Sequence, residues 1–170
     1  MTEMILLYDL EKAIVRIDEL IALNEMELAK NELEDLLFEA PDFGKAHGYL
    51  GWIYANFFQD EKRAEIHYLY SIKFDLEFVG AYVNYALLLL NQNRVIEAKE
   101  ILEGALLQNN IDKSLIYEVY ADVFESEGKL TKAILVLKRA LKLSRDPLQE
   151  DHLIARIKRL KRKRWTLFSF

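Results

Sequence analysis

The sequence of 170 residues contains no cysteine, only two prolines and only six glycines. Without cysteine there can be no disulfide framework, no thiolate metal site and no thiol nucleophile. With so few prolines and glycines, little in the chain interrupts helices, because these two residue types end or bend them. The chain also lacks a run of about 18 apolar residues, so no membrane-spanning helix is expected.

Sequence motifs of catalysis and cofactor binding are missing as well. There is no GxGxxG, Walker loop, GxSxG or HExxH. His47, His67 and His152 stand far apart without metal-ligand spacing, and His47 is expected to be a buried packing residue. The N-terminus has an acidic residue before a very short apolar run, which is untypical of a secretory signal. We therefore predict no catalytic residue, metal site or cofactor, and a cytoplasmic protein that is not an enzyme.

Charge is distributed unevenly along the chain, whose net charge is −5. Residues 1–151 hold 28 acidic and 16 basic side chains, a net charge of −12, whereas residues 152–170 hold seven basic side chains and no acidic one. A long acidic part followed by a short basic part indicates that the two make different contacts.

Small residues recur at a nearly constant interval. Four alanines are separated by 35, 34 and 35 residues: Ala29, Ala64, Ala98 and Ala133. Each is followed four residues later by a large apolar residue: Leu33, Tyr68, Leu102 and Leu137. A period of this length is typical of a stack of identical supersecondary units.

Apolar residues recur at helical spacing through most of the chain, and no alternating strand pattern is found. Asp146, Pro147 and Gln149 predict the start of the last helix, with a capping box and a proline in the first turn. The predicted helices cover about residues 3–22, 25–39, 44–57, 61–74, 78–91, 94–108, 113–126, 130–144 and 148–164.

The residues around the alanines resemble the tetratricopeptide repeat, whose pattern is W-x2-L-G-x2-Y followed by A-x3-F. The second unit reads His47-x2-Leu50-Gly51-x2-Tyr54, then Ala64-x3-Tyr68. The third reads Tyr82-x2-Tyr85-Ala86-x2-Leu89, then Ala98-x3-Leu102, and the fourth Tyr117-x2-Tyr120-Ala121-x2-Phe124, then Ala133-x3-Leu137. The first unit is degenerate in its opening helix, and Pro41 is the only closing proline.

This resemblance implies an all-α fold, a right-handed superhelix of about four helix-turn-helix units. The units would cover about residues 10–43, 44–78, 79–112 and 114–147. A basic amphipathic capping helix with an aromatic tail would follow over residues 148–170. Small residues are expected where the two helices of a unit cross, and the large residues fill the spaces between units.

In proteins of this family the first helices of the units line a concave groove. The face of each first helix that the core does not use is expected to point into that groove. The residues on this face are Asp18; Tyr49, Trp52 and Asn56; Asn84, Leu87 and Asn91; and Glu118, Asp122 and Glu125. Amides and aromatic rings suit an extended peptide, and the acidic end would favour a basic one. The alternative is an ordinary half-exposed surface.

Cations crowd the last helix: Arg156, Lys158, Arg159, Lys161, Arg162, Lys163 and Arg164. Its apolar stripe predicts a cap that covers the last repeat. Two other interpretations stay open, an electrostatic contact with nucleic acid or an anionic membrane, and self-association through the acidic groove of a second copy. The helix could also fold back near Glu118, Asp122 and Glu125 and compete with a partner.

These features predict a non-enzymatic protein–protein interaction scaffold that binds a peptide or helix of another protein in the groove. The alternatives are a secretion-type chaperone that holds a client segment, and an adaptor to nucleic acid or anionic membrane. The carboxylate clamp of some family members is not expected. Residues other than cations and amides stand where a clamp would need those groups: Gly48, Trp52, Leu115 and Val119.

Overall fold

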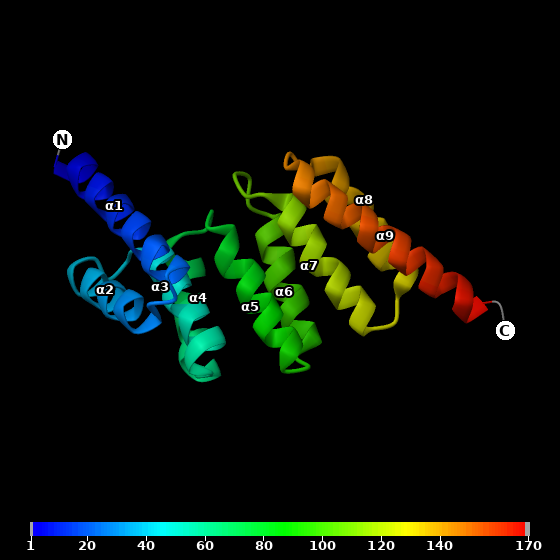
Figure 1. The fold of residues 1–170 in the computed structure, drawn as a ribbon, viewed down its shortest axis with the longest axis horizontal. Coiled ribbons are helices and arrows are strands. Elements are labelled where there is room, and N and C mark those ends of the chain that lie inside the picture. Colours follow the sequence, from blue (N-terminus) through cyan, green and yellow to red (C-terminus); the bar gives the residue numbers. More distant parts are fainter. Residues whose placement is uncertain (1, 169–170) are drawn as a thin grey trace. The chain divides into compact units, whose positions relative to one another are not determined.

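The computed structural model describes residues 2–168, with side chains from Leu10 to Leu167. The chain forms two compact units, Met1–Ala81 and Tyr82–Phe170, and each is described here by itself. Figure 1 traces their helices in sequence order. Within the described residues there is no strand, and no helix is long and apolar enough to cross a membrane.

Unit 1 is built from helices that pack on their neighbours in sequence: α1 on α2, α2 on α3, and α3 on α4. Its elements are α1 (Thr2–Ala22), α2 (Met26–Glu39), α3 (Gly44–Ile53), the π-helix η1 (Tyr54–Phe58), α4 (Glu61–Phe74) and the start of α5 (Val79–Asn91).

Unit 2 contains the rest of α5 and four further helices, in which α6 packs on α7, α7 on α8, and α8 on α9. These helices are α6 (Val95–Leu106), α7 (Lys113–Ser126), α8 (Leu130–Leu143) and α9 (Pro147–Phe168). The bounds agree with the predicted helices to within a few residues at most ends. The exception is α9, which continues to Phe168, so Trp165 belongs to a helix rather than to a tail. Residues 169–170 of the expected tail lie outside the described residues.

The repeat alanines and the large apolar residues that follow them form part of the buried core. All four repeat alanines are fully buried. Their large partners are at most 1% exposed: Leu33, Tyr68, Leu102 and Leu137. Where α3 crosses α4, a Cβ on Gly51 would lie 2.6 Å from the ring of Tyr68, so the ring occupies the space that a side chain would need. Helices of one unit therefore approach closely because one of them carries almost no side chain at the crossing.

Left-handed residues end the first helix of every repeat: Asn24 (φ 62°), Gln59 (φ 54°), Asn93 (φ 60°) and Gly128 (φ 70°). In three repeats the next amide bonds to a carbonyl five residues back, as Arg94 N does to Leu89 O at 2.8 Å. In the second repeat Asp60 N instead reaches six residues back, to Tyr54 O at 2.9 Å. The spacing from Ala29 to Ala64 is 35 residues, one more than from Ala64 to Ala98. The π turn η1 accommodates this additional residue.

Helix α9 begins at the predicted place. Leu148 N donates to the carboxylate of Asp146 at 3.0 Å, so Asp146 caps the helix as expected. The predicted capping box is wrong in one respect. The side chain of Gln149 accepts from Ser144 Oγ at 2.8 Å and from Ser114 Oγ at 3.2 Å. It ties the start of α9 to α7 instead of completing a cap.

Candidate interaction surfaces

The first candidate surface lies on α1, α3 and η1 of unit 1. It carries four of the residues predicted to face a groove: Asp18, Tyr49, Trp52 and Asn56. We call these four residues the aromatic–amide face. Tyr49 and Trp52 are half-buried, while Asp18 and Asn56 are exposed. The spacing of three and four residues places Tyr49, Trp52 and Asn56 on one side of a helix.

Tyr49 is held in place from two sides. Its hydroxyl donates to Asp18 Oδ1 at 2.7 Å, and its ring stacks on that of Phe78, with centroids 6.2 Å apart and planes 10° apart. Burial, aided by the hydrogen bond to Asp18, raises the pKa of Tyr49. The neighbouring Gly48 makes room for this stack, because a Cβ there would lie 2.3 Å from the ring of Phe78. Two predicted groove residues therefore contact each other, and one is a rigid aromatic side chain.

Asn56 lies in the π turn that follows α3. Its side-chain amide donates to the carbonyl of Trp52 at 2.9 Å. A π turn shifts the backbone hydrogen bonds by one residue, and the Asn56 side chain provides a donor for the Trp52 carbonyl. The exposed amide is thereby fixed next to the half-buried indole of Trp52.

The middle residues of the predicted groove all come from α5. Asn84 is half-buried, whereas Leu87 and Asn91 are exposed. Their side chains are thus at least partly accessible in unit 2.

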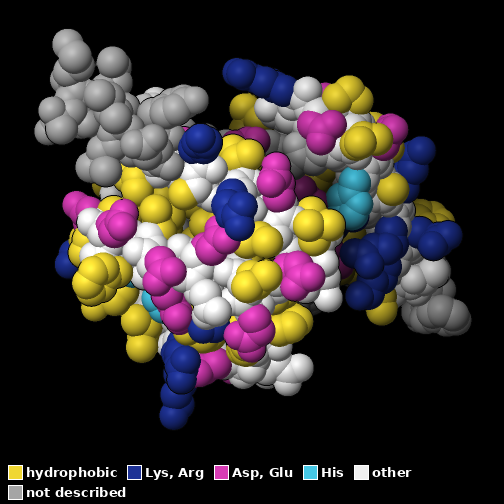
Figure 2. All heavy atoms as spheres, turned by 60° about the vertical axis from the view of Figure 1, so that its left-hand side comes forward, with side chains coloured by type: hydrophobic (Ala, Val, Ile, Leu, Met, Phe, Trp, Pro, Cys, Tyr) yellow, Lys and Arg dark blue, Asp and Glu magenta, His cyan; other side chains and the backbone are white. Residues whose placement is uncertain are grey.

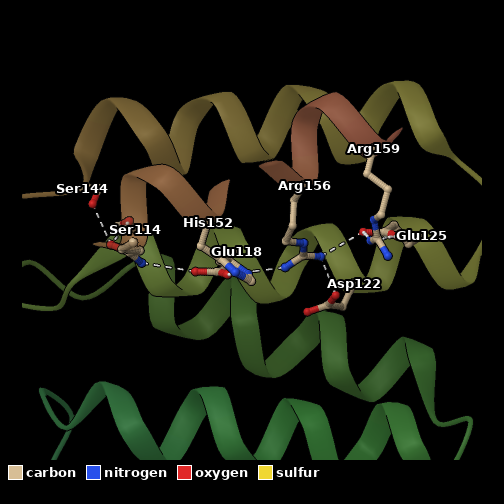
Figure 3. Close-up of polar contacts among 9 residues, drawn as sticks. Ser114, Glu118, Asp122, Glu125, Ser144, His152, Arg156 and Arg159 are labelled. Carbon is tan, nitrogen blue, oxygen red and sulfur yellow. Dashed lines mark hydrogen bonds and ion pairs between the residues drawn. The ribbon is translucent and has the colours of Figure 1, made fainter. Parts of the chain in front are cut away.

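The second candidate surface is an ion-pair array between α7 and α9 in unit 2, shown in Figure 3. We call it the charge ladder; it consists of Glu118, Asp122 and Glu125 on α7 and His152, Arg156 and Arg159 on α9. Each of the three residues on α9 stands 34 residues after its acidic counterpart on α7, which is one repeat length. Equivalent positions on successive first helices are therefore side by side.

Arg156 is the centre of the ladder. Its guanidinium lies 2.6 Å from Asp122 Oδ1, 2.9 Å from Glu125 Oε1 and 3.5 Å from Glu118 Oε1, and only 13% of its side chain is exposed. Arg159 adds a contact of 2.9 Å to Glu125. Burial raises the pKa of Asp122, and the neighbouring Arg156 partly offsets that effect.

His152 completes the ladder at its outer end. Its Nε2 lies 3.2 Å from Glu118 Oε1, so the two groups can share a hydrogen bond. The acidic residues that were expected at one end of the groove are thus already paired with the chain's own last helix. The sequence analysis considered that the last helix folds back near Glu118, Asp122 and Glu125, but it did not predict the individual pairs. Adding one repeat length to each of these residues identifies its partner.

A histidine pair in unit 1 was also not predicted. His47 Nδ1 lies 3.0 Å from His67 Nδ1, and His47 Nε2 lies 3.0 Å from the carbonyl oxygen of Pro41. Since a carbonyl only accepts, Nε2 of His47 carries the proton there, and Nδ1 of His47 accepts from His67. His47 is buried, as the sequence predicts. Burial lowers the pKa of both rings, that of His67 to about 4.

Three further observations bear on chemistry. In the described part of the chain, no group of three or more His, Asp or Glu side chains could hold a metal ion. Shallow hollows occur beside the charge ladder and between α8 and α9. Asp122 and His152 line the first hollow, and Ile134 and Leu135 line the second together with Lys138 and Lys161.

Comparison with known proteins agrees with this architecture. The family model described as tetratricopeptide repeat matches residues 79–111 and 115–147. Two segments of the chain thus carry the sequence pattern of a tetratricopeptide repeat. A search of curated protein sequences finds no significant match.

Solved structures with the same repeat fold cover most of the chain. PilF of Pseudomonas aeruginosa is 22% identical with a TM-score of 0.73, over 94% of this chain and 75% of that one. Yeast Tom70 is 15% identical with a TM-score of 0.75, over 91% of this chain and 33% of that one. PilW, a type IV pilus biogenesis factor, is 18% identical with a TM-score of 0.69, over 78% of this chain and 61% of that one. At these identities the likeness establishes the fold, an all-α stack of tetratricopeptide helix pairs.

Proposed function

We propose that this repeat protein is an interaction scaffold whose aromatic–amide face binds an extended segment of another protein. The observation that carries the proposal is the fixed side chain of Tyr49 beside the half-buried Trp52. Large aromatic side chains that are already ordered lose little conformational freedom when a partner docks. Asn56 adds an amide that can bond to a peptide backbone.

The basic character expected of the partner is not part of this proposal. The carboxylates of Glu118, Asp122 and Glu125 are paired with α9, and Asp18 accepts from Tyr49. A basic segment would have to displace existing cations to reach the first three. The proposed partner is therefore recognised by apolar side chains and backbone groups. Holding an unfolded client segment would use the same face, so a chaperone role predicts the same critical residues.

The test compares the two tryptophans of the chain. A peptide selected from a display library against the wild-type protein is titrated against Trp52→Ala and Trp165→Ala. We expect Trp52→Ala to weaken binding by about tenfold or more, as loss of a central aromatic contact does, and Trp165→Ala to leave it unchanged. Circular dichroism and the melting midpoint confirm that both variants are folded. Equal affinity of Trp52→Ala and wild type would refute the proposal.

A further inference from the structure

One surface of the α8–α9 pair in unit 2 is exposed to solvent. The equivalent position one repeat earlier, on α7, is instead packed against other residues of the unit. Phe124 on α7 packs against the core around α8, and the residue one repeat later is Lys158 on α9. Ile154, one turn earlier on the same side of α9, is 37% exposed. We call this surface the open face; it comprises Lys132, Leu135, Lys138, Ile154, Lys158, Lys161, Arg164 and Trp165.

The open face carries charge of a single sign. Helix α8 contains no Asp or Glu, and neither does α9 from His152 onward. Arg156 and Arg159 are taken up by the charge ladder. Among the described residues, no carboxylate partner is recorded for the other cations of the two helices: Lys132, Lys138, Arg139, Lys142, Lys158, Lys161, Arg162, Lys163 and Arg164. The ladder thus fixes α9 on one side and leaves a dense positive charge on the other.

Large apolar side chains lie among these cations. Leu135 is 54% exposed, Trp165 77% and Leu167 65%. A shallow hollow between α8 and α9 is lined by Ile134 and Leu135, with Lys138 and Lys161 beside it. Exposed tryptophan and leucine side chains next to lysine and arginine are typical of surfaces that lie in the interface of an anionic bilayer.

We propose that the open face docks on a bilayer that contains anionic lipids. The cations attract the negative surface, and their long stems allow the charged groups to stay with the headgroups while Leu135 and Trp165 enter the boundary region. A nucleic acid would use the same cations, but the exposed Leu135 has no function in base stacking or phosphate contact. The combination of aliphatic and cationic side chains therefore favours a lipid surface.

The experiment is flotation of the full chain with vesicles of phosphatidylcholine alone and of equal parts phosphatidylcholine and phosphatidylserine. The test variant is Lys138→Gln/Lys158→Gln/Lys161→Gln. Its matched control, Lys12→Gln/Lys62→Gln/Lys73→Gln, removes the same charge from exposed positions of unit 1. Each lysine near an anionic surface contributes roughly fivefold to partitioning, so the test variant should lose about 100-fold and the control little. Partitioning of the wild type should also fall steeply with added salt.

A second measurement reports insertion. Trp165 emission, recorded in a Trp52→Phe background, should shift to the blue with the serine-lipid vesicles and remain unchanged with phosphatidylcholine alone. Equal partitioning of the wild type into both vesicle types would overturn the proposal, as would equal losses in the two triple variants. Binding to double-stranded RNA without binding to vesicles would also overturn it and assign the face to nucleic acid.

Discussion

The two units use the same repeat frame but differ in charge and in what lies beside their first helices. Residues 1–81 contain 17 acidic and 7 basic side chains, a net charge of −10, whereas residues 82–170 contain 11 and 16, a net charge of +5. Figure 2, in which the side of unit 1 comes forward, shows acidic side chains scattered among hydrophobic ones. The acidic part of the chain is thus concentrated in unit 1, and unit 2 is basic once α9 is included.

The polar contacts follow the same division. In unit 1, the contacts of α3 include the neutral His47–His67 pair and the Tyr49–Phe78 stack, in addition to ion pairs such as Lys45–Glu11. In unit 2, the corresponding layer is ionic, with Arg156 surrounded by three carboxylates. The same repeat frame therefore accommodates two kinds of polar contact between helices.

The largest effect that distinguishes the units is expected from Arg156→Ala. Removing one partner of a largely desolvated ion pair leaves like charges facing each other, here three carboxylates, and costs about 3 kcal/mol of unfolding free energy. Urea unfolding followed by circular dichroism measures this loss. Arg162→Ala is the control, because its side chain is exposed and should shift stability by no more than about 0.5 kcal/mol. Equal urea midpoints for Arg156→Ala and Arg162→Ala would contradict this prediction. They would mean that solvent screens the charges of the ladder, which then contributes little to stability.

A pH effect of intermediate size is expected from the histidine pair of unit 1. The pKa of His67 is lowered from 6.5 to about 4 in the folded state, so the unfolded chain binds more protons between these values. Stability is therefore complete above pH 6.5 and falls as the pH decreases toward 4. Because the ring is partly solvated, we expect a loss of about 1–2 kcal/mol between pH 7 and pH 5.

Urea unfolding of wild type and His67→Gln at the two pH values isolates this contribution. The glutamine amide can still donate to His47 Nδ1 but does not titrate, so most of the pH dependence in this range should disappear. A His67→Gln slope equal to that of wild type would show that the pair is not a buried neutral one.

Much of the fold could be predicted from the sequence because the repeat period reports helix packing directly. The buried alanines and their large partners at Leu33, Tyr68, Leu102 and Leu137 were all identified from spacing alone. The helix ranges follow from the apolar periodicity, and the fold class follows from the resemblance to the tetratricopeptide repeat. The repeat frame is thus encoded by residues that are close in the sequence.

The surfaces were harder to predict, because a side chain's accessibility depends on which helix is packed beside it. Glu118 and Asp122 have the sequence pattern of a solvated helix face, and only the position of α9 makes them partners of His152 and Arg156. The histidine pair joins α3 to α4 next to a π turn, and one extra residue there alters the local register. The repeat period of 34–35 residues describes whole repeats, so it does not predict where within a repeat the helical register shifts by one residue.

The smallest expected difference between the units concerns equivalent turn residues. Gln59 in unit 1 and Gly128 in unit 2 both adopt left-handed φ values, 54° and 70°. A residue with a Cβ is strained there, whereas glycine is not. Gln59→Gly should therefore raise the unfolding free energy by about 0.5–1 kcal/mol, and Gly128→Gln should lower it by about 1 kcal/mol.

Exchanging the two residues separates backbone strain from side-chain contacts. A Cβ at Gly128 would meet no heavy atom within 4 Å, so a loss there can only come from the backbone conformation. The double variant Gln59→Gly/Gly128→Gln should have almost the stability of wild type, because the gain in one turn offsets the loss in the other. Unfolding in urea of both single variants and of the double variant tests this. If Gln59→Gly instead destabilised the protein, the glutamine would have to stabilise the turn after η1 through its side chain, and the four turns would not be equivalent.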